Sequence, residues 1–225
     1  DLPPPTSLFE LCRRIADLDA APRIRLSSLD PLEVKPALIR LLAGPPRFCR
    51  HLHLPLQSGD ERILRRMRRG HTAAQFHELV ERLVTEVPGI AVSGDVIVGF
   101  PSEDDRAFQS TIDLLNALPI AGMHVFSYSR RPGTDAAGYP DQVAKQVKAE
   151  RSRMLRSLVA RKAQTFRRQF LGETLAVVVL HRDGPNGLLE SLSDNYLRVW
   201  FAGDPALCGG VARVRVEQVT GRGLL

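Results

Sequence analysis

Polar residues of a few types gather where four apolar segments of this sequence end. They supply hydroxyl, amide, carboxylate and guanidinium groups, a set that suits a polar small molecule carrying ribose hydroxyls, a carboxylate and an amine. The same residue types also start turns and cap helices, so a purely structural role is the alternative interpretation. The residues are Ser28, Asp30, Gln57, Ser58, Asp95, Gly99, Tyr128, Ser129, Arg131 and Thr134.

The four apolar segments are predicted β-strands near residues 24–29, 50–55, 90–99 and 121–128. Segments with helical periodicity lie between them, and this alternation favours parallel β/α units with right-handed crossovers. In such folds binding sites lie at the carboxyl ends of the strands, so the polar residues are expected to meet at one edge. Four units are too few for a closed eight-fold barrel. The predicted fold class is therefore α/β, a partial parallel β/α barrel or an open sheet.

Start and stop signals place helices between these strands. In the segment DPLEVKPALIRLLAG, Asp30 is the predicted N-cap, Pro31 the first helical residue and Gly44 the stop. Pro36 is expected to kink that helix or delay its start. Thr72 is the predicted N-cap of a later helix.

The periodicity of apolar residues changes near Phe170. A long helical pattern covers residues 141–170, and short alternating segments with Gly, Asp and Pro turns follow it. These short segments are typical of a small all-β barrel of OB-like size. We therefore expect a β/α domain at 1–140, a basic linking helix at 141–170 and a β-domain at 171–225.

Positive charge is concentrated in the predicted linking helix. The chain has 31 Lys and Arg against 25 Asp and Glu, a formal charge of +6. Between Lys145 and Arg168 there are nine basic residues and one acid, so the rest of the chain is slightly acidic. This segment is the expected contact for a polyanion, and a solvated helix face is the alternative.

The pair His51 and His53 raises a metal-binding alternative. Residues two apart on a strand face the same side, and an H-x-H pair on a barrel strand can hold zinc in hydrolases. Further ligands would have to come from residues such as His124 or Asp95. Packed or hydrogen-bonded histidines are the other interpretation, and His71 is expected on a helix surface.

Several other chemistries lack their sequence signatures. The cysteines Cys12, Cys49 and Cys208 are too far apart for a C-x-x-C pair, a zinc spacing or a disulfide framework, which indicates a reducing, cytoplasmic location. The phosphate-binding patterns G-x-G-x-x-G and G-x-x-x-x-G-K-[ST] are absent. The first residues lack the pattern of a signal peptide, and no apolar run approaches the roughly 18 residues that cross a bilayer, so no membrane partner is expected.

Four ordered motifs make this sequence resemble a known family. They are RIRLSSLDP, HLHLPLQSGDERILRRMRR, DVIVGFPSEDDRAF and HVFSYSRRPGTDAA, the last followed by PDQV. Together they resemble the later part of the radical S-adenosylmethionine core of bacterial methylthiotransferases. Through LSSLDP and SRRPGTDAA, the sequence is similar to the branch that acts on N6-threonylcarbamoyladenosine beside the tRNA anticodon. The segment NYLRVWF resembles the TRAM domain, the small RNA-binding β-barrel of that family.

The resemblance implies roles for individual residues. The cofactor S-adenosylmethionine would be bound by Ser28, Asp30, Gln57, Ser58, Asp95, Val98 and Gly99. The substrate or clusters would face Tyr128, Ser129, Arg131 and Thr134. RNA would contact Lys145, Lys148, Arg151, Asn195, Tyr196 and Arg198. Asp30 and Ser102 depart from the Glu and Gly that are usual in the family, which changes details of the pocket.

The resemblance also implies two four-iron four-sulfur clusters, for which this sequence lacks the thiolate ligands. The family holds one cluster with a C-x-x-x-C-x-x-C loop and the other with three further cysteines, and three scattered cysteines cannot replace them. We therefore expect the chain to be the C-terminal part of a longer enzyme that methylthiolates C2 of the modified adenosine. It should be inactive alone, with no catalytic protein residue assigned and no electron donor indicated.

Two other functions stay open at this point. A sister branch of the family methylthiolates an aspartate of a ribosomal protein, and its members share the same core motifs. An RNA-binding module without chemistry would also need a basic helix and a β-domain. The tRNA methylthiotransferase hypothesis differs from both, because it requires the tRNA anticodon arm as partner and as substrate.

Overall fold

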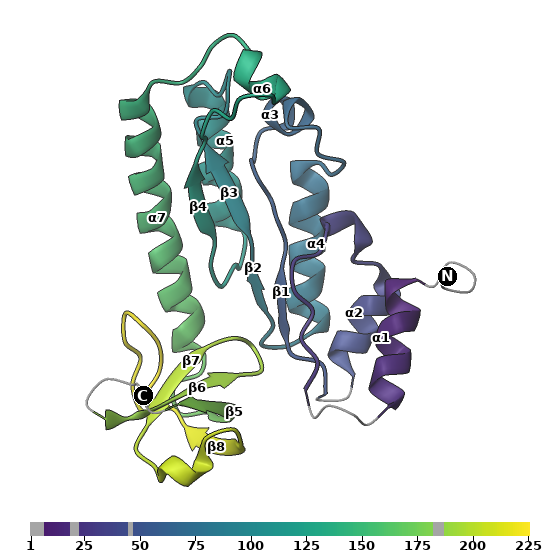
Figure 1. Ribbon diagram of the computed structural model, residues 1–225, viewed down its shortest axis with the longest axis vertical. Coiled ribbons are helices and arrows are strands. Elements are labelled where there is room, and N and C mark those ends of the chain that lie inside the picture. The colour runs from purple at the N-terminus through teal and green to yellow at the C-terminus, as the bar shows by residue number, and fades with distance from the viewer. Residues whose placement is uncertain (1–6, 19–22, 45–46, 182–186) are drawn as a thin grey trace.

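The computed structural model describes residues 7–18, 23–44, 47–181 and 187–225 (Figure 1). An α/β unit fills the upper part of Figure 1, a small β-unit lies below it, and a long helix connects the two. The helices are α1 (Leu8–Asp17), η1 (Pro31–Glu33), α2 (Pro36–Ala43), α3 (Glu61–Arg66), α4 (Ala73–Glu86), α5 (Asp105–Ala117), α6 (Asp135–Gly138), α7 (Lys145–Arg168) and η3 (Pro205–Leu207). The strands are β1 (His51–His53), β2 (Ala91–Ser93), β3 (Asp95–Val98), β4 (His124–Ser127), β5 (Thr174–His181), β6 (Leu189–Ser193), β7 (Arg198–Phe201) and β8 (Val211–Arg215).

The α/β unit is built on parallel strand pairs. Strand β1 pairs with β2, and β3 pairs with β4, both in parallel. A further parallel bridge between Gln57 and Val96 links the segment after β1 to β3. On the other side, Leu29 N–H donates to His53 C=O and a bridge joins Ile24 to Phe48. The strand-like segments therefore lie side by side in the order 24–29, 51–57, 91–98 and 124–127, which confirms the predicted parallel α/β arrangement.

The predicted strand over 90–99 is interrupted, and a glycine explains why. Strands β2 and β3 are separated at Gly94, where a Cβ atom would lie 1.9 Å from the Leu54 carbonyl oxygen. Only a residue without a side chain allows the neighbouring segment to approach this closely. Similarly, residues 24–29 form a single bridge at Ile24 and no regular strand.

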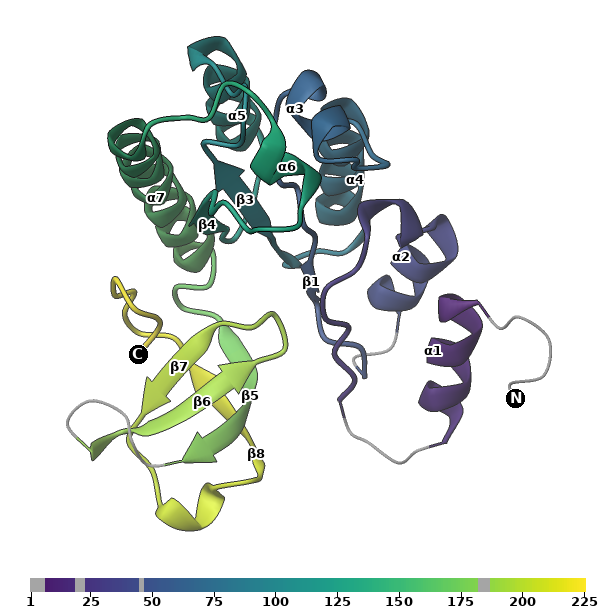
Figure 2. The ribbon, with the colours of Figure 1, turned by 45° about the horizontal axis from the view of Figure 1, so that its top comes forward.

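One face of these strands is apolar and covered by helices. Figure 2 shows α2, α4, α5 and α7 as an arc around the strands. The strand residues that point to them are fully buried in one core and alternate with polar residues, as a two-residue period requires. These buried residues are Leu52, Leu54, Leu56, Val92, Val96 and Val98. Their alternates His51, His53, Ser93 and Asp95 therefore belong to the opposite face.

Local sequence signals set the helix ends as predicted. The Asp30 carboxylate accepts from the Leu32 N–H and caps η1, which Pro31 begins. Pro36 starts α2 after this short turn, so the proline delays the helix and does not kink it, and Gly44 ends it. Thr72 and Gln75 form a reciprocal capping box at the start of α4. The caps fix where each helix returns the chain to the sheet.

A buried ion pair holds the loop that follows β3. The Glu103 side chain accepts from the Gly99 N–H at 2.8 Å and from the Arg151 guanidinium at 2.8 Å. Burial raises the pKa of Glu103, whereas the Gly99 N–H and Arg151 oppose that effect. A second nitrogen of Arg151 contacts Asp105 at 2.8 Å, but that carboxylate is fully exposed. Helix α7 is thereby tied to the carboxyl end of β3.

The β-unit is an antiparallel sheet in the order β7-β6-β5-β8. Leu224, the second-to-last residue, adds a parallel bridge to Val199 of β7. Helix α7 ends at Arg168, and β5 begins at Thr174. The core of this unit contains Phe166 of the helix together with Val177 and Val199 of the sheet, so the unit packs onto the end of α7.

The two units meet at the amino ends of β1 and β2. Arg50 forms an ion pair with Asp194 at 2.6 Å, and the Asn195 amide donates to the Gly89 carbonyl at 3.2 Å. Tyr196 stacks on His51 with ring centroids 4.6 Å apart. The β-unit is thus docked at the end of the parallel strands opposite to their carboxyl ends (Figure 1).

Replacing Arg151 by methionine should destabilise the fold strongly. The change leaves the Glu103 carboxylate buried without its cation, which typically costs about 3–5 kcal/mol. The control is Arg153→Met, because Arg153 lies two residues further along α7 and is exposed; it should change the free energy of unfolding by less than about 0.5 kcal/mol. Urea unfolding measures both. Equal destabilisation by the two variants would contradict a structural role for the buried pair.

Candidate functional site

A small cavity lies at the carboxyl ends of the parallel strands. It has a volume of about 310 Å³ and an apolar part formed by Ile97 and Phe100. Gln57, Arg66 and Tyr139 are also among its lining residues. The Arg66 guanidinium lies 4.6 Å from the centre of the Tyr139 ring, so a cation–π contact shapes one wall. We call this the carboxyl-end cavity.

Gln57 is a lining residue whose side chain has an uncommitted hydrogen-bond acceptor. Its backbone has φ of 72°, a left-handed conformation that is unusual for a residue other than glycine. The side chain is 6% exposed, and its Oε1 atom has no hydrogen-bond partner among the residues that the structure describes. Buried polar groups in proteins are nearly always paired. The unpaired amide oxygen of Gln57 therefore marks a position where a ligand could donate a hydrogen bond.

The loop after β4 contributes one of its four predicted residues to this region. The Tyr128 ring packs edge-on against Phe100 at 5.2 Å, and its hydroxyl is buried without a partner in the described part of the chain. Lys148 of α7 donates to the Tyr128 carbonyl at 3.1 Å. Thr134, in contrast, is exposed and its hydroxyl closes a turn onto the Arg131 carbonyl. Ser129 and Arg131 are exposed as well, which fits turn residues better than a binding site.

Several residues predicted to bind the cofactor have other tasks. Ser58 is fully buried, and its hydroxyl accepts from the Asp60 N–H in the turn before α3. Val98 is fully buried in the core, although Gly99 beside it keeps a left-handed φ of 73°. A Cβ at Gly99 would lie 2.1 Å from the Lys148 side chain, so the glycine is needed for that packing. The Ser58 hydroxyl is therefore committed to the turn and is not accessible to a cofactor, whereas the role expected of the backbone at Val98 and Gly99 stays a prediction.

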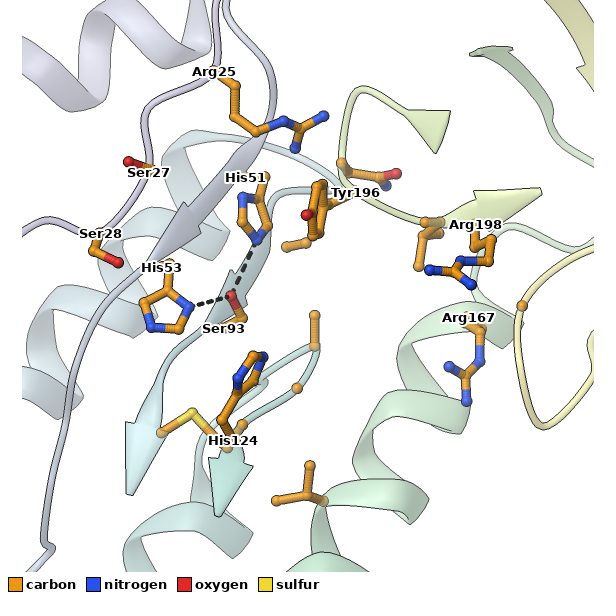
Figure 3. Close-up of a pocket in the computed structure, with 18 of the residues that line it drawn as sticks. Arg25, Ser27, Ser28, His51, His53, Ser93, His124, Arg167, Tyr196 and Arg198 are labelled. Atoms are coloured by element: carbon orange, nitrogen blue, oxygen red, sulfur yellow. Dashed lines mark hydrogen bonds between the residues drawn. The ribbon is translucent and has the colours of Figure 1, made fainter. Parts of the chain in front are cut away.

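Ser28 lies away from the carboxyl-end cavity. It lines a larger cavity between the α/β unit and the β-unit, together with Arg25, His51, His53 and Ser93 (Figure 3). We call this the junction cavity. Asp95 lines neither cavity, and its carboxylate is 3.0 Å from His53 Nε2. The structure therefore divides the predicted cofactor residues between two places and does not bring Ser28 and Gln57 into one pocket.

A chain of hydrogen bonds crosses the polar face of the sheet. Ser93 Oγ lies 3.1 Å from His51 Nε2 and 3.4 Å from His53 Nδ1, so the hydroxyl bridges the two imidazoles (Figure 3). Burial lowers the pKa of His51 to about 4, and the positive charges of Arg25 and His53 add to this effect. His51 is therefore neutral at pH 7 and can accept or donate one hydrogen bond at each nitrogen according to its tautomer.

The predicted RNA contacts also separate into exposed and buried residues. Lys145 is exposed, Tyr196 is 53% exposed, and Arg198 is exposed while paired with Glu190 at 3.0 Å. Arg151 and Asn195 are buried, and both are committed to contacts inside the protein. The expectation that Arg151 and Asn195 contact RNA is corrected, because neither side chain is accessible.

Two histidine predictions also have clear outcomes. His71 was expected on a surface, but it is 3% exposed and its Nε2 lies 3.2 Å from the Leu56 carbonyl oxygen, so that prediction is wrong. The zinc alternative needed ligands to join His51 and His53. In the described ranges, no group of three or more His, Cys, Asp or Glu side chains is arranged to hold a metal ion.

Sequence reasoning missed the junction cavity. The period-two pattern of His51, His53 and Ser93 was a usable signal that these side chains share a face. No pattern in the sequence revealed that Tyr196 of the β-unit would cover that face, because the docking of two units depends on tertiary contacts.

None of the helices in the described part of the chain has the length and apolarity that crossing a membrane requires.

Comparisons with known proteins agree with the parallel α/β architecture. The model of the Radical SAM superfamily matches residues 3–115, half of the chain. The chain belongs to the radical SAM superfamily. Coproporphyrinogen III oxidase from Escherichia coli, a radical SAM enzyme, superposes with a TM-score of 0.56 over 84% of this chain and 50% of that chain, at 16% identity. At this identity the likeness concerns the fold alone.

Similar sequences cover nearly all of the radical SAM chain. The tRNA-2-methylthio-N(6)-dimethylallyladenosine synthase of Geobacter sulfurreducens is 38% identical over 212 residues, 94% of this chain and 48% of that protein. The protein of the same name from Maricaulis maris is 36% identical over 210 residues, 93% of this chain and 46% of that protein. The chain thus spans about half the length of the curated relatives it matches.

The family implies S-adenosylmethionine and a four-iron four-sulfur cluster as cofactors, and the residues present fit them unequally. The carboxyl-end cavity offers the free Gln57 amide oxygen and an apolar floor, which suits a nucleoside-containing cofactor. A cluster requires neighbouring thiolates. Cys12 and Cys49 are buried and Cys208 is exposed, and within the described residues no cluster of metal ligands exists. The chain's own residues therefore do not fit an iron–sulfur cluster.

The lowered pKa of His51 should make stability depend on pH. The unfolded chain binds a proton near pH 6.5, whereas folded His51 binds it only near pH 4, so stability is lost as the pH falls through this window. The loss can reach about 3 kcal/mol, since one pKa unit corresponds to about 1.36 kcal/mol. Urea unfolding at pH 7.5, 6 and 5 should show a steeper loss for wild type than for His51→Gln, which does not titrate. Identical slopes would contradict the assignment.

Proposed function

We propose that this chain is the part of a tRNA methylthiotransferase that binds S-adenosylmethionine and positions RNA. The observation that carries the proposal is the 36–38% identity, along more than nine-tenths of the chain, to enzymes named for making 2-methylthio-N(6)-dimethylallyladenosine in tRNA. The carboxyl-end cavity supports it, because parallel β/α folds bind their ligands at this end of the sheet. The reaction would place a methylthio group on C2 of an N6-modified adenosine next to the anticodon.

In this proposal the carboxyl-end cavity holds the cofactor. Gln57 accepts a hydrogen bond from a ribose hydroxyl or from the ammonium group, and Ile97 and Phe100 exclude water from the adenine. Asp135 would add little, because its carboxylate is already paired with Arg68. The bound cofactor, together with a reduced cluster, would provide the radical chemistry needed to activate the C2–H bond. The cluster's thiolate ligands would come from residues outside this chain.

The β-unit and the exposed part of α7 are proposed to contact the RNA. The β-unit would act as a TRAM-like domain, with Tyr196 and Arg198 accessible on the side of the junction. Lys145 begins the basic helix that leads to it and is also exposed. Exposed cations attract a polyanion to this side of the molecule but do not read its sequence. In this proposal, the modified adenosine is therefore recognised near the carboxyl-end cavity.

The N6 group of the adenosine is the detail on which the supporting observations differ. The motifs LSSLDP and SRRPGTDAA favour threonylcarbamoyladenosine, whereas the two relatives described above are named for dimethylallyladenosine. No described side chain at the carboxyl-end cavity selects between the two groups. We retain the threonylcarbamoyl-modified nucleoside as the proposed substrate and test it directly against the other.

Deleting the gene that encodes this chain should abolish one methylthio-adenosine from cellular tRNA. Mass spectrometry of digested tRNA identifies which one: loss of the threonylcarbamoyl form supports the proposed substrate, and loss of the dimethylallyl form assigns the other branch. If both nucleosides persist unchanged, tRNA methylthiolation is excluded and the ribosomal-protein aspartate becomes the substrate to examine.

Complementation with a Gln57→Ala variant should restore the nucleoside poorly. Losing one hydrogen bond to a polar ligand costs roughly 1–2 kcal/mol, about a tenfold loss of affinity for S-adenosylmethionine. The matched control is Gln109→Ala, because Gln109 is exposed on α5 and bonds only to Asp113. Full activity of Gln57→Ala at limiting S-adenosylmethionine would contradict the assignment of the cofactor to this cavity.

A further inference from the structure

The junction cavity is a built site that the proposed chemistry does not use. It has a volume of about 580 Å³, within the range of about 300–1,000 Å³ that is usual for small-molecule sites. One wall is the polar face at the start of the parallel strands, and the other is formed by β6–β7, the end of α7 and the C-terminal loop (Figure 3). Both units are therefore needed to complete it.

Positive charge dominates the lining of this cavity. Among the described residues that line it, there are four arginines and three histidines and no Asp or Glu. The arginines come from four separate parts of the chain, namely Arg25, Arg167, Arg198 and Arg222. Arg222 is exposed, and no contact of its side chain to another residue is found in the described part of the chain. A lining of this composition favours an anion.

The arginines are not equally free to meet a ligand. Arg25 lies over the Tyr196 ring at 4.4 Å and reaches the Ser193 carbonyl, so it supports the wall. Arg198 is paired with Glu190, and Arg167 donates one bond to the Gly221 carbonyl. The Arg167 Nε atom is buried and unpaired within the described residues. Arg167 and Arg222 are therefore the cations with the most uncommitted donors, and Figure 3 shows Arg167 on α7 at the cavity.

The opposite wall is aromatic and hydrogen-bonding. His53 and His124 meet edge to face with ring centroids 5.6 Å apart, and His124 is exposed. Ser93 adds a hydroxyl between His51 and His53. His51 is only 6% exposed, and its buried Nδ1 atom has no hydrogen-bond partner among the described residues. Flat rings beside donors and acceptors are the features with which proteins hold a nucleobase.

We infer that the junction cavity binds a single nucleotide, with its phosphate at Arg167 and Arg222 and its base against the His53–His124 wall. S-adenosylmethionine is disfavoured here, because the lining offers no carboxylate to its ammonium and sulfonium groups. A divalent metal is disfavoured as well, since the lining offers no carboxylate. The nucleotide can belong to an RNA strand or be free in solution, and its recognition chemistry is the same in both cases.

The inference deepens the proposed function where the nucleotide belongs to RNA, and to that extent it rests on it. It does not depend on the methylthio chemistry, because the cavity lies at the amino ends of the strands and the carboxyl-end cavity lies at the other edge. A binding measurement on this chain therefore fails or succeeds separately from the analysis of cellular tRNA nucleosides.

Isothermal titration calorimetry of the 225-residue chain tests the site with four probes, namely adenosine monophosphate, adenosine, inorganic phosphate and a seven-residue single-stranded RNA. We expect one nucleotide per chain, with adenosine and phosphate each binding at least about tenfold more weakly than a probe that carries both groups, since a charge-assisted hydrogen bond is worth about 1.5–3 kcal/mol or tenfold and more. Tight binding of the monophosphate assigns a free nucleotide, whereas binding of the RNA alone assigns a residue of a strand.

Two variants locate the site. Arg222→Ala and His124→Ala alter exposed residues on opposite walls, and each should weaken binding of the preferred probe by about tenfold. Arg215→Ala is the control, because Arg215 is an exposed arginine of the same β-unit outside the cavity, and it should bind like the wild type. Absence of binding by both the monophosphate and the RNA overturns the inference. Equal weakening by Arg222→Ala and Arg215→Ala overturns it too, because it would show general charge attraction.

Discussion

The two-residue alternation of the parallel strands is the constraint on which both cavities depend. Leu52, Leu54 and Leu56 are completely buried against the helices, and burying each such side chain contributes about 1.5–3 kcal/mol. A slip of one residue would turn these leucines to the open face and the histidines into the core, at a cost no local contact could offset. The helix-covered core therefore fixes which side chains form the polar face, the face that the helices leave open.

The second constraint is the way helix α7 carries the β-unit back to the start of the strands. Arg151 anchors the helix beside the loop after β3, and Phe166 joins its other end to the core of the β-unit. The Arg50–Asp194 ion pair and the stacking of Tyr196 on His51 then fix how the unit docks. Tyr196 holds a φ of 66°, and a strained backbone of this kind persists where surrounding contacts determine it. The junction cavity follows from this docking.

The parts of the structure that depend on local sequence were predictable. Segments with a two-residue period predicted the parallel strands. Asp30 and Thr72 predicted where helices begin and Gly44 where one ends, because capping needs only neighbouring residues. The roles of Ser58 and Arg151 were not obtained from residue type, since a hydroxyl or a guanidinium can serve a turn or a core as well as a ligand. For Arg151 a signal existed: it precedes the buried Leu155 by four residues and so lies on the buried side of α7.

The site itself required tertiary information of two kinds. The left-handed backbone at Gln57, which directs its side chain toward the cavity, depends on how the segment after β1 pairs with β3. The residue type alone does not predict this conformation. The junction cavity needed the distance between units that are more than a hundred residues apart in the sequence. In contrast, sharing of one face by His51, His53 and Ser93 follows from spacing and strand register alone.

The two cavities lie at opposite edges of one sheet, and Asp95 stands between them. Its carbonyl accepts from the Gln57 N–H at 2.8 Å, while its carboxylate lies 3.0 Å from His53 Nε2 in the junction cavity. Because this carboxylate contacts His53 and does not line the junction cavity, it leaves the arginines of that cavity available to an anion. The amide oxygen of Gln57 remains uncommitted at the other edge. Asp95, which lines neither cavity, thus connects a lining residue of one cavity with a lining residue of the other.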